Sequence, residues 1–270
     1  MDVGDYMLVR LDKHLVEASV ASRSQVKELI KKGRISVNGN NKLKPEQKID
    51  NEKDKVFFDG KEIILKRYEY FMLNKPAGVI SASRDKKAKT VVDLIKDKTR
   101  ADLFPIGRLD KDTHGLLIIS NDGDLAHKML SPKKHVEKTY FLKAKGIINK
   151  EAIKLFKEGV ILKDSSKEDG FFKTLPAKLE ILETRKESLD YLEEDSREMM
   201  HFEGELTLCR ITIKEGKYHQ IKKMFKSINS EVLYLQRISM GNLVLDPELK
   251  EGDYRELTDK ELEDLKGLNL

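Results

Sequence analysis

The run over residues 107–123 constrains the fold and chemistry of this chain more than any other stretch. It is a glycine-bounded turn that carries Arg108 and Asp110, followed by a Thr-x-Gly corner and an apolar strand. An apolar strand is buried, so the turn that precedes it is expected to be held rigidly. A rigidly held carboxylate beside an arginine is typical of a catalytic site. An ordinary surface turn is the alternative, because loop aspartates are mostly exposed.

The composition indicates a protein of one or two domains that meets a polyanion. The chain has 270 residues, of which 39% are hydrophobic and 37% are charged, and its net charge is +5. These proportions allow a real core beneath a strongly solvated surface. The single cysteine, Cys209, excludes an intrachain disulfide and suits a reducing compartment. No apolar run is long enough to span a bilayer. We therefore expect a cytoplasmic protein.

Residues 8–66 predict a small unit of two helices followed by short strands. The first helix is expected over residues 10–20. The second begins after Ser22, where Gln25 completes a capping box, and ends at Gly33. The predicted strands are 35–37, 56–58 and 62–65.

The second of these helices carries a basic face that could follow the phosphates of RNA, although a lysine-rich solvent face is the ordinary alternative. The motifs RLDK (10–13), SRSQ (22–25) and GRISVNG (33–39) resemble, in this order, the S4 RNA-binding domain shared with ribosomal protein S4. The resemblance implies contacts that position the RNA backbone without reading bases. The matching residues are Arg10, Arg23, Ser24, Lys27, Lys31, Lys32 and Arg34.

Residues 68–264 predict a second, α+β domain. A strand over 70–73 leads into a Lys-Pro-x-Gly turn, which we expect to present Lys75 to RNA. A mobile basic loop is expected over 84–89. The other predicted elements are short helices at 90–95 and 125–132, strands at 139–144 and 206–213, a helix that opens near 219–225, and a capped helix at 256–262.

Three of these elements carry side chains that could act together. Asp110 supplies an acid, Tyr140 an aromatic hydroxyl and Lys222 a cation. A carboxylate beside a fixed ammonium stays ionised and oriented, as nucleophilic or base catalysis requires. A tyrosine can stack on a flipped base and can also exchange a proton. The alternatives are a core tyrosine and a solvated lysine.

Longer motifs around these residues resemble the RsuA-type pseudouridine synthases (the RsuA/RluB/RluE/RluF family). They are GRLD (107–110) with Thr113-x-Gly115, EKTY (137–140) and GKYHQIKKMF (216–225). The resemblance implies an N-terminal S4 domain followed by a catalytic domain on a mixed, largely antiparallel sheet with flanking helices. It also implies that Asp110 is the catalytic aspartate and that Arg108 helps to hold the uridine out of the base stack. Tyr140 would pack on the target base and Lys222 would pair with Asp110.

The reaction implied by this resemblance is the isomerisation of uridine within RNA, without a metal or an organic cofactor. The histidines show no metal-ligand spacing such as HExxH, and no P-loop or Gly-x-Gly-x-x-Gly motif is present. Whether Asp110 acts as a nucleophile or as a base is left open. The expected partner is ribosomal RNA, free or within an assembling subunit, and the protein is expected to be a monomer.

The motif YHQIKKMF (218–225) resembles the branch of the family that modifies small-subunit (16S) rRNA. Large-subunit (23S) rRNA is the alternative, and a non-catalytic ribosome-assembly factor is a weaker one. A glycoside hydrolase is disfavoured because the chain has no tryptophan to form a sugar platform.

One segment departs from the family pattern. Residues 184–203 are rich in acids, where a short hairpin is usual. We expect a solvated surface insertion.

Overall fold

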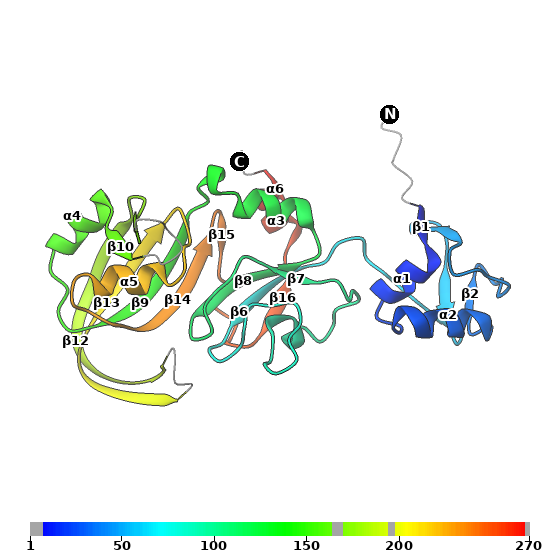
Figure 1. Cartoon of the computed structure of the whole chain (residues 1–270), viewed down its shortest axis with the longest axis horizontal. Coiled ribbons are helices and arrows are strands. Elements are labelled where there is room, and N and C mark those ends of the chain that lie inside the picture. The colour runs from blue at the N-terminus through cyan, green and yellow to red at the C-terminus, as the bar shows by residue number, and fades with distance from the viewer. Residues whose placement is uncertain (1–7, 164–169, 194–197, 268–270) are drawn as a thin grey trace. The chain divides into compact units, whose positions relative to one another are not determined.

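The computed structural model describes residues 8–163, 170–193 and 198–267 and divides into two compact units (Figure 1). The first unit comprises the chain up to Glu69 together with Ile95–Leu103. The second comprises Tyr70–Leu94 and the chain from Phe104 onward. No helix in the described parts is both long and apolar enough to cross a membrane.

The first unit consists of two short helices and small sheets. Strand β1 pairs with β3, and β4 lies between β2 and β5. The elements are β1 (Leu8–Arg10), α1 (Leu11–Glu17), α2 (Arg23–Lys31), β2 (Ile35–Val37), β3 (Lys48–Asp50), β4 (Val56–Phe58) and β5 (Lys61–Glu62).

The predicted capping of α2 is confirmed. The backbone N–H of Ser22 donates to Oε1 of Gln25 at 3.1 Å, and the reciprocal bond completes the capping box. The helix buries Val26 and Ile30 in a core with Leu11 and Leu15 of α1. Its opposite face is therefore left to solvent. All seven predicted RNA-contact residues of this unit are exposed.

The segment Ile95–Leu103 packs with the first unit through Arg100. This arginine is 5% exposed, and its guanidinium forms ion pairs with Glu17 at 3.0 Å and Asp102 at 2.7 Å. The backbone N–H of Ala101 also donates to the carbonyl of Glu17. No feature of the sequence had indicated that this segment belongs with α1.

The second unit is built on a nine-stranded sheet. Its main order is β12-β13-β9-β14-β8-β6-β16, with β15 paired to β14 and β7 paired to β8. The strands are β6 (Tyr70–Lys75), β7 (Phe104–Ile106), β8 (His114–Ser120), β9 (Lys138–Lys145), β12 (Lys178–Leu192), β13 (Met199–Ile213), β14 (Val232–Met240), β15 (Leu243–Val244) and β16 (Tyr254–Glu256).

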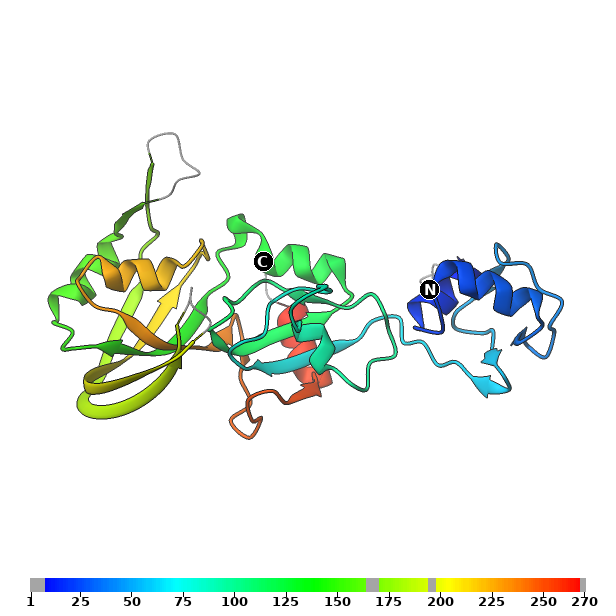
Figure 2. The same cartoon turned by 60° about the horizontal axis from the view of Figure 1, so that its bottom comes forward.

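Helices and one separate hairpin flank this sheet. The hairpin joins β10 (Ile161–Lys163) to β11 (Phe171–Lys173). The helices are the 3-10 turns η1 (Val91–Leu94) and η2 (Pro132–Lys134) and the α-helices α3 (Gly123–Leu130), α4 (Glu151–Glu158), α5 (Gln220–Lys226) and α6 (Asp259–Lys266). Figures 1 and 2 show α5 lying across β13, β9 and β14. The predicted mixed and largely antiparallel sheet is confirmed, since among the named strands only β8 and β14 pair in parallel.

A hydrophobic core packs α3 and α6 against strands of the sheet. Met129 of α3 and Leu265 of α6 pack with Ile118 of β8 and Met240 of β14. At the start of α3, Asp122 accepts a hydrogen bond from the N–H of Leu125, which satisfies one free backbone donor. Cys209 is fully buried in β13, and burial raises the pKa of its thiol to about 12.

The acidic segment forms an extended hairpin. The ladder of β12 and β13 runs from Lys178 opposite Thr212 to Leu192 opposite Met199, with a register shift near Ile181. The predicted insertion is therefore strand-paired along most of its described length. Residues 194–197, between the two strands, lie outside the described residues.

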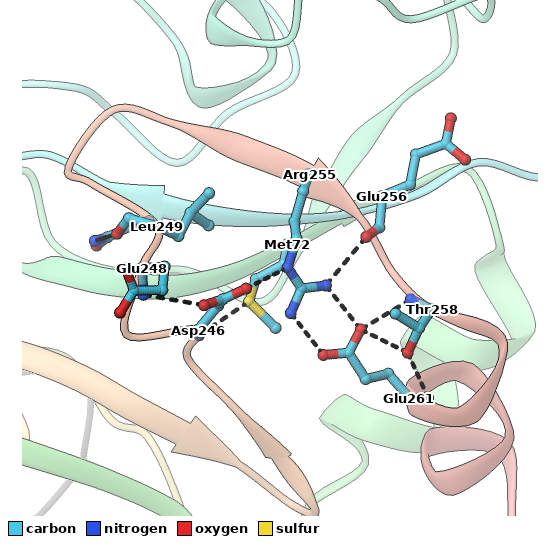
Figure 3. Close-up of polar contacts among 9 residues, drawn as sticks. Met72, Asp246, Glu248, Leu249, Arg255, Glu256, Thr258 and Glu261 are labelled. Atoms are coloured by element: carbon cyan, nitrogen blue, oxygen red, sulfur yellow. Dashed lines mark hydrogen bonds and ion pairs between the residues drawn. The ribbon is translucent and has the colours of Figure 1, made fainter.

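Arg255 connects the edge strand β16 to α6 and to the loop after β15 (Figure 3). Its guanidinium donates to both carboxylate oxygens of Glu261 at 2.8 Å, and its Nε donates to Asp246 at 2.7 Å. Thr258 caps α6 and shares the Glu261 carboxylate. These bonds lower the pKa of Glu261 to about 2 and also lower that of Asp246.

Several predicted elements differ from the structure. The first helix ends at Glu17 rather than at residue 20, and α3 ends at Leu130 rather than at Pro132. Residues 63–65 do not continue β5, residues 91–94 form a 3-10 turn, and the last helix begins three residues later than predicted, at Asp259. In the last case, Tyr254–Glu256 is recruited as an edge strand by β6.

Candidate active site

The loop between β7 and β8 presents Asp110 and is held along its length. Gly107 begins the loop with a φ of +85°, and a Cβ at this position would lie 3.0 Å from Cδ2 of Leu130 in α3. Leu109 is buried, and its N–H and carbonyl both bond the hydroxyl of Ser81, at 3.0 and 2.7 Å. The carbonyl of Asp110 accepts the N–H of Thr113. The Asp110 side chain is 33% exposed, so a buried backbone presents a reachable carboxylate.

Lys75 is fully buried beneath this loop, so the prediction that the Lys-Pro-x-Gly turn exposes it to RNA is wrong. Its ammonium donates to the carbonyls of Pro76, Lys111 and Thr113, at 3.0, 3.1 and 2.8 Å. An ammonium has three protons to donate, and three carbonyls accept them here. Burial lowers the pKa of Lys75 to about 8, and the nearby carboxylates of Asp112 and Asp110 oppose this shift.

Gly115 allows β14 to approach the end of the loop. A Cβ at this position would lie 2.8 Å from the backbone nitrogen of Arg237, closer than real Cβ contacts, and the φ of Gly115 is +101°. The parallel register pairs Gly115 with Arg237. The Thr-x-Gly corner is therefore the point at which the loop and β14 come into contact.

A cavity of about 210 Å³ opens beside the loop. Arg108, Asp110, Tyr140 and Lys222 all line it. Tyr140 projects from β9 and is 7% exposed. Burial raises the pKa of its phenol, and the positive charge of Arg237 only partly opposes that rise. The hydroxyl is therefore protonated at neutral pH and available as a donor.

The opposite wall comes from α5 and the turn before it. Lys222 forms an ion pair with Asp112, its Nζ lying 2.5 Å from Oδ2, and both side chains are largely buried. His219, with a φ of +52°, places Nε2 3.7 Å from the carboxylate of Asp110. Its ring stacks on the exposed ring of Tyr218 with 3.5 Å between centroids.

The structure thus gathers the four residues predicted for catalysis around one cavity. It also shows an ion pair of Lys222 with Asp112, which was not predicted. A direct pair between Lys222 and Asp110 stays a prediction. Lys75 was predicted to contact RNA, but it is buried and donates to carbonyls of the loop.

Sequence reasoning missed two charged groups. Asp112 was not singled out, because its sequence position does not distinguish it from other acidic residues in polar turns. Arg237 is 2% exposed, and its Nε donates to the carbonyl of Leu116 at 2.8 Å. The available signal was its position, because Leu233, Leu235 and Arg237 alternate on the buried face of β14.

Comparison with known proteins relates this arrangement to a family. Residues 69–227 match the model of the RNA pseudouridylate synthases, and residues 9–56 match the S4 domain. The chain is 42% identical to a Bacillus subtilis protein named as an uncharacterized RNA pseudouridine synthase, over 94% of this chain and 97% of that one. The chain belongs to the RNA pseudouridine synthases.

Two named relatives place it among the RsuA/RluB-type enzymes of this family. The chain is 38% identical to the ribosomal large subunit pseudouridine synthase B of Bacillus subtilis, over 96% of each chain. It is 33% identical to the ribosomal small subunit pseudouridine synthase A of Haemophilus influenzae, over 95% of this chain and 99% of that one.

A crystal structure of a pseudouridylate synthase gives the same result for the fold. It is 32% identical, covers 95% of this chain and 99% of its own, and superposes with a TM-score of 0.60. The protein is therefore an isomerase that acts on RNA, with an N-terminal S4 domain ahead of its catalytic unit.

Proposed function

We propose that this synthase modifies a uridine of small-subunit (16S) ribosomal RNA in the cytoplasm, with Asp110 as its catalytic aspartate. The observation that carries the catalytic assignment is that Asp110, Tyr140 and Lys222 line one cavity although they come from three distant segments. The rRNA assignment rests on the motif over residues 218–225, whose first five residues line the cavity, and on relatives named as small subunit synthases at 31–34% identity.

The reaction breaks the N1–C1′ bond of uridine, turns the uracil and joins C5 to C1′. C5 loses its hydrogen as a proton and N1 gains one, so atoms balance without an oxidant or reductant. The uridine has to leave the helix stack first, because its reacting atoms are not accessible there. Arg108 is exposed and lines the cavity, so it can help to hold the uridine out of the stack.

The carboxylate of Asp110 would work at the sugar, either as a nucleophile at C1′ or as a base for a sugar proton. Both roles need an ionised acid with a fixed direction. The Ser81 bonds to Leu109 and the three carbonyls on Lys75 provide the direction. Lys222 adds positive charge to the cavity, where it lies against Asp112. The ring of Tyr140 would pack against the uracil. Because the pKa of this buried phenol is raised, its hydroxyl would donate a hydrogen bond rather than accept one.

Large-subunit (23S) rRNA is the second candidate. It is favoured by the 38% identity to the large subunit synthase B of Bacillus subtilis, which is higher than the identity to the small subunit synthases. Mapping pseudouridines with carbodiimide in both rRNAs, from cells with and without this gene product, separates the two. A site lost only in 23S rRNA would overturn the 16S assignment.

The catalytic assignment is tested by Asp110→Asn, which keeps the side chain's size and removes its charge. With rRNA labelled with tritium at C5 of uridine, the wild-type enzyme releases tritium and this variant should release none, while it still binds RNA. Asp124→Asn, an exposed acid on α3, is the matched control and should keep full activity. Normal tritium release by Asp110→Asn would refute the assignment.

A further inference from the structure

A second and larger cavity adjoins the catalytic one. Its volume is about 820 Å³, and the two cavities have Arg108, Tyr140, Gly216 and Lys217 as common walls. The catalytic cavity, at about 210 Å³, falls below the ~300–1,000 Å³ of most small-molecule sites, whereas the second lies within that range. Whatever occupies the second cavity therefore lies beside the target nucleoside.

The walls of this cavity combine apolar surface with positive charge. The apolar part comes from Pro105, Leu130, Pro132, Val136 and Leu175. The cationic part comes from Arg108, Lys138, Lys173, Lys214, Lys217 and Arg237. The one carboxylate among the described lining residues, Glu215, is already bonded to the N–H of Leu175 and to Gln220. Such a lining suits a ligand with a flat apolar part and a negative part.

Arg237 is the strongest sign that something binds there. It is only 2% exposed, and its Nε donates to the carbonyl of Leu116. Its Nη2 makes no hydrogen bond of normal geometry within the described chain, although the phenol of Tyr140 lies near the guanidinium. A buried guanidinium nitrogen without an acceptor is costly, so such groups normally meet a ligand or an ion. Because Arg237 lines the second cavity and the strand pairing at Gly115 fixes its backbone, this donor is preorganised for an anion.

Two lysines reinforce the positive charge. Lys138 is half-buried, with Nζ 2.9 Å from the carbonyl of Val136, and burial lowers its pKa to about 8. Lys217 holds its ammonium 3.7 Å from the ring centroid of Phe172 on β11. Both side chains are thus positioned by the protein before any ligand arrives.

We propose that the second cavity binds a nucleotide adjacent to the target uridine, with its base against the apolar wall and its phosphate against Arg237 and the neighbouring lysines. A free phosphate would leave most of the volume empty. A covalently linked neighbour fits, because the common wall at Tyr140 and Arg108 places the two occupants side by side. The inference rests on the catalytic cavity being the one that holds Asp110.

The test perturbs the RNA and the protein together. The probe is a synthetic stem-loop that carries the mapped uridine, in which each phosphate next to that uridine is replaced in turn by an uncharged methylphosphonate. For the wild-type enzyme, one such replacement should raise KM about tenfold with a smaller effect on kcat. An abasic nucleotide at the same neighbour should also raise KM.

The protein side uses two variants. The first is the double variant Lys173→Ala/Lys214→Ala, which removes two exposed cations that line the cavity. The second is Arg237→Lys, which keeps the positive charge but replaces the guanidinium by an ammonium. Each should raise KM for the unmodified stem-loop, and each should lose most of its additional sensitivity to the methylphosphonate. If Arg237→Lys does not fold, the double lysine variant alone decides. Lys154→Ala on α4, outside the cavity, is the matched control and should respond to the methylphosphonate as the wild type does.

Purely additive effects of protein and RNA changes, or no response to any neighbouring replacement, would overturn the inference. This failure differs from failure of the catalytic assignment, which would appear as tritium release by Asp110→Asn on the unmodified stem-loop.

Discussion

The ammonium of Lys75 lies 2.8 Å from the carbonyl oxygen of Thr113, inside the loop that carries Asp110, the proposed catalytic aspartate. Two more carbonyls complete its set of acceptors. The three donors of this lysine therefore hold backbone carbonyls, and a fully buried side chain supports the loop that carries Asp110.

Replacing Lys75 with methionine keeps the length of the side chain and removes its three donors. We expect kcat to fall by about tenfold or more, because a small displacement of a catalytic group lowers the rate of the chemical step strongly. The KM should change less. Single-turnover rates measure this, and Lys86→Met, an exposed lysine of the nearby loop, is the control. An unchanged kcat would show that the loop holds its shape without Lys75.

Lys75 also predicts a pH dependence with opposite signs for stability and activity. Its pKa is about 8 in the folded protein and 10.5 for the ordinary group. Between these values the unfolded chain binds more protons, so this residue makes stability rise with pH. The neutral amine has lost one donor, so kcat should fall over the same range. Denaturant titrations at pH 7.5 and 10 should show the stability rise in the wild type and a smaller one in Lys75→Met.

Gly115→Ala should disturb the contact between the loop and β14. The added Cβ would lie 2.8 Å from the Arg237 nitrogen at a φ of +101°, and we expect a loss of about 1–3 kcal/mol. Gly123→Ala, in helix α3 with open space around the new methyl group, is the matched control. It should be neutral or stabilising by about 0.5–1 kcal/mol. Equal thermal shifts for the two variants would contradict the close approach.

Charge reversal on α2 tests the RNA-binding face of the S4 domain. Arg23→Glu and Lys27→Glu should each weaken RNA binding and reduce the slope of log affinity against log salt by about one, as for the loss of one phosphate contact. Both residues are exposed, so folding should not change. Lys61→Glu on β5 serves as a control outside the motif. Affinity that stays the same at low salt for both α2 variants would count against this face.

The Arg255 network predicts acid sensitivity. The pKa of Glu261 is lowered from 4.5 to about 2, so its contribution to stability is complete above pH 4.5 and is lost as the pH falls toward 2. Arg255→Met should cost about 1–3 kcal/mol at pH 7. The variant should also lose less stability than the wild type between pH 5 and 2.5. Parallel acid-denaturation curves would show that the pairing contributes little.

Local signals predicted the parts of the fold that depend on neighbouring residues. The Ser22–Gln25 capping box formed as expected, and the apolar run after Thr113 became the buried strand β8. Four predicted site residues line one cavity, and long motifs rather than single residues had singled them out. The fold class followed from the same motifs.

What escaped prediction depends on long-range pairing. A lysine is usually exposed, and only the arrival of two loop carbonyls more than thirty residues away explains why Lys75 is buried. The ion pair of Lys222 with Asp112 was not predicted, because whether an acid of this loop reaches α5 depends on how the loop is folded. The length of the β12–β13 hairpin depends on cross-strand pairing over residues that are individually polar.

The buried sulfhydryl in β13 makes this protein convenient for spectroscopy. Cys209 is inaccessible, and with a pKa of about 12 it holds almost no reactive thiolate at neutral pH. Since the chain has no other cysteine, a thiol introduced on an exposed residue of each unit would be the one that takes a dye. Energy transfer between two such dyes would then report the separation of the S4 domain and the second unit with and without RNA.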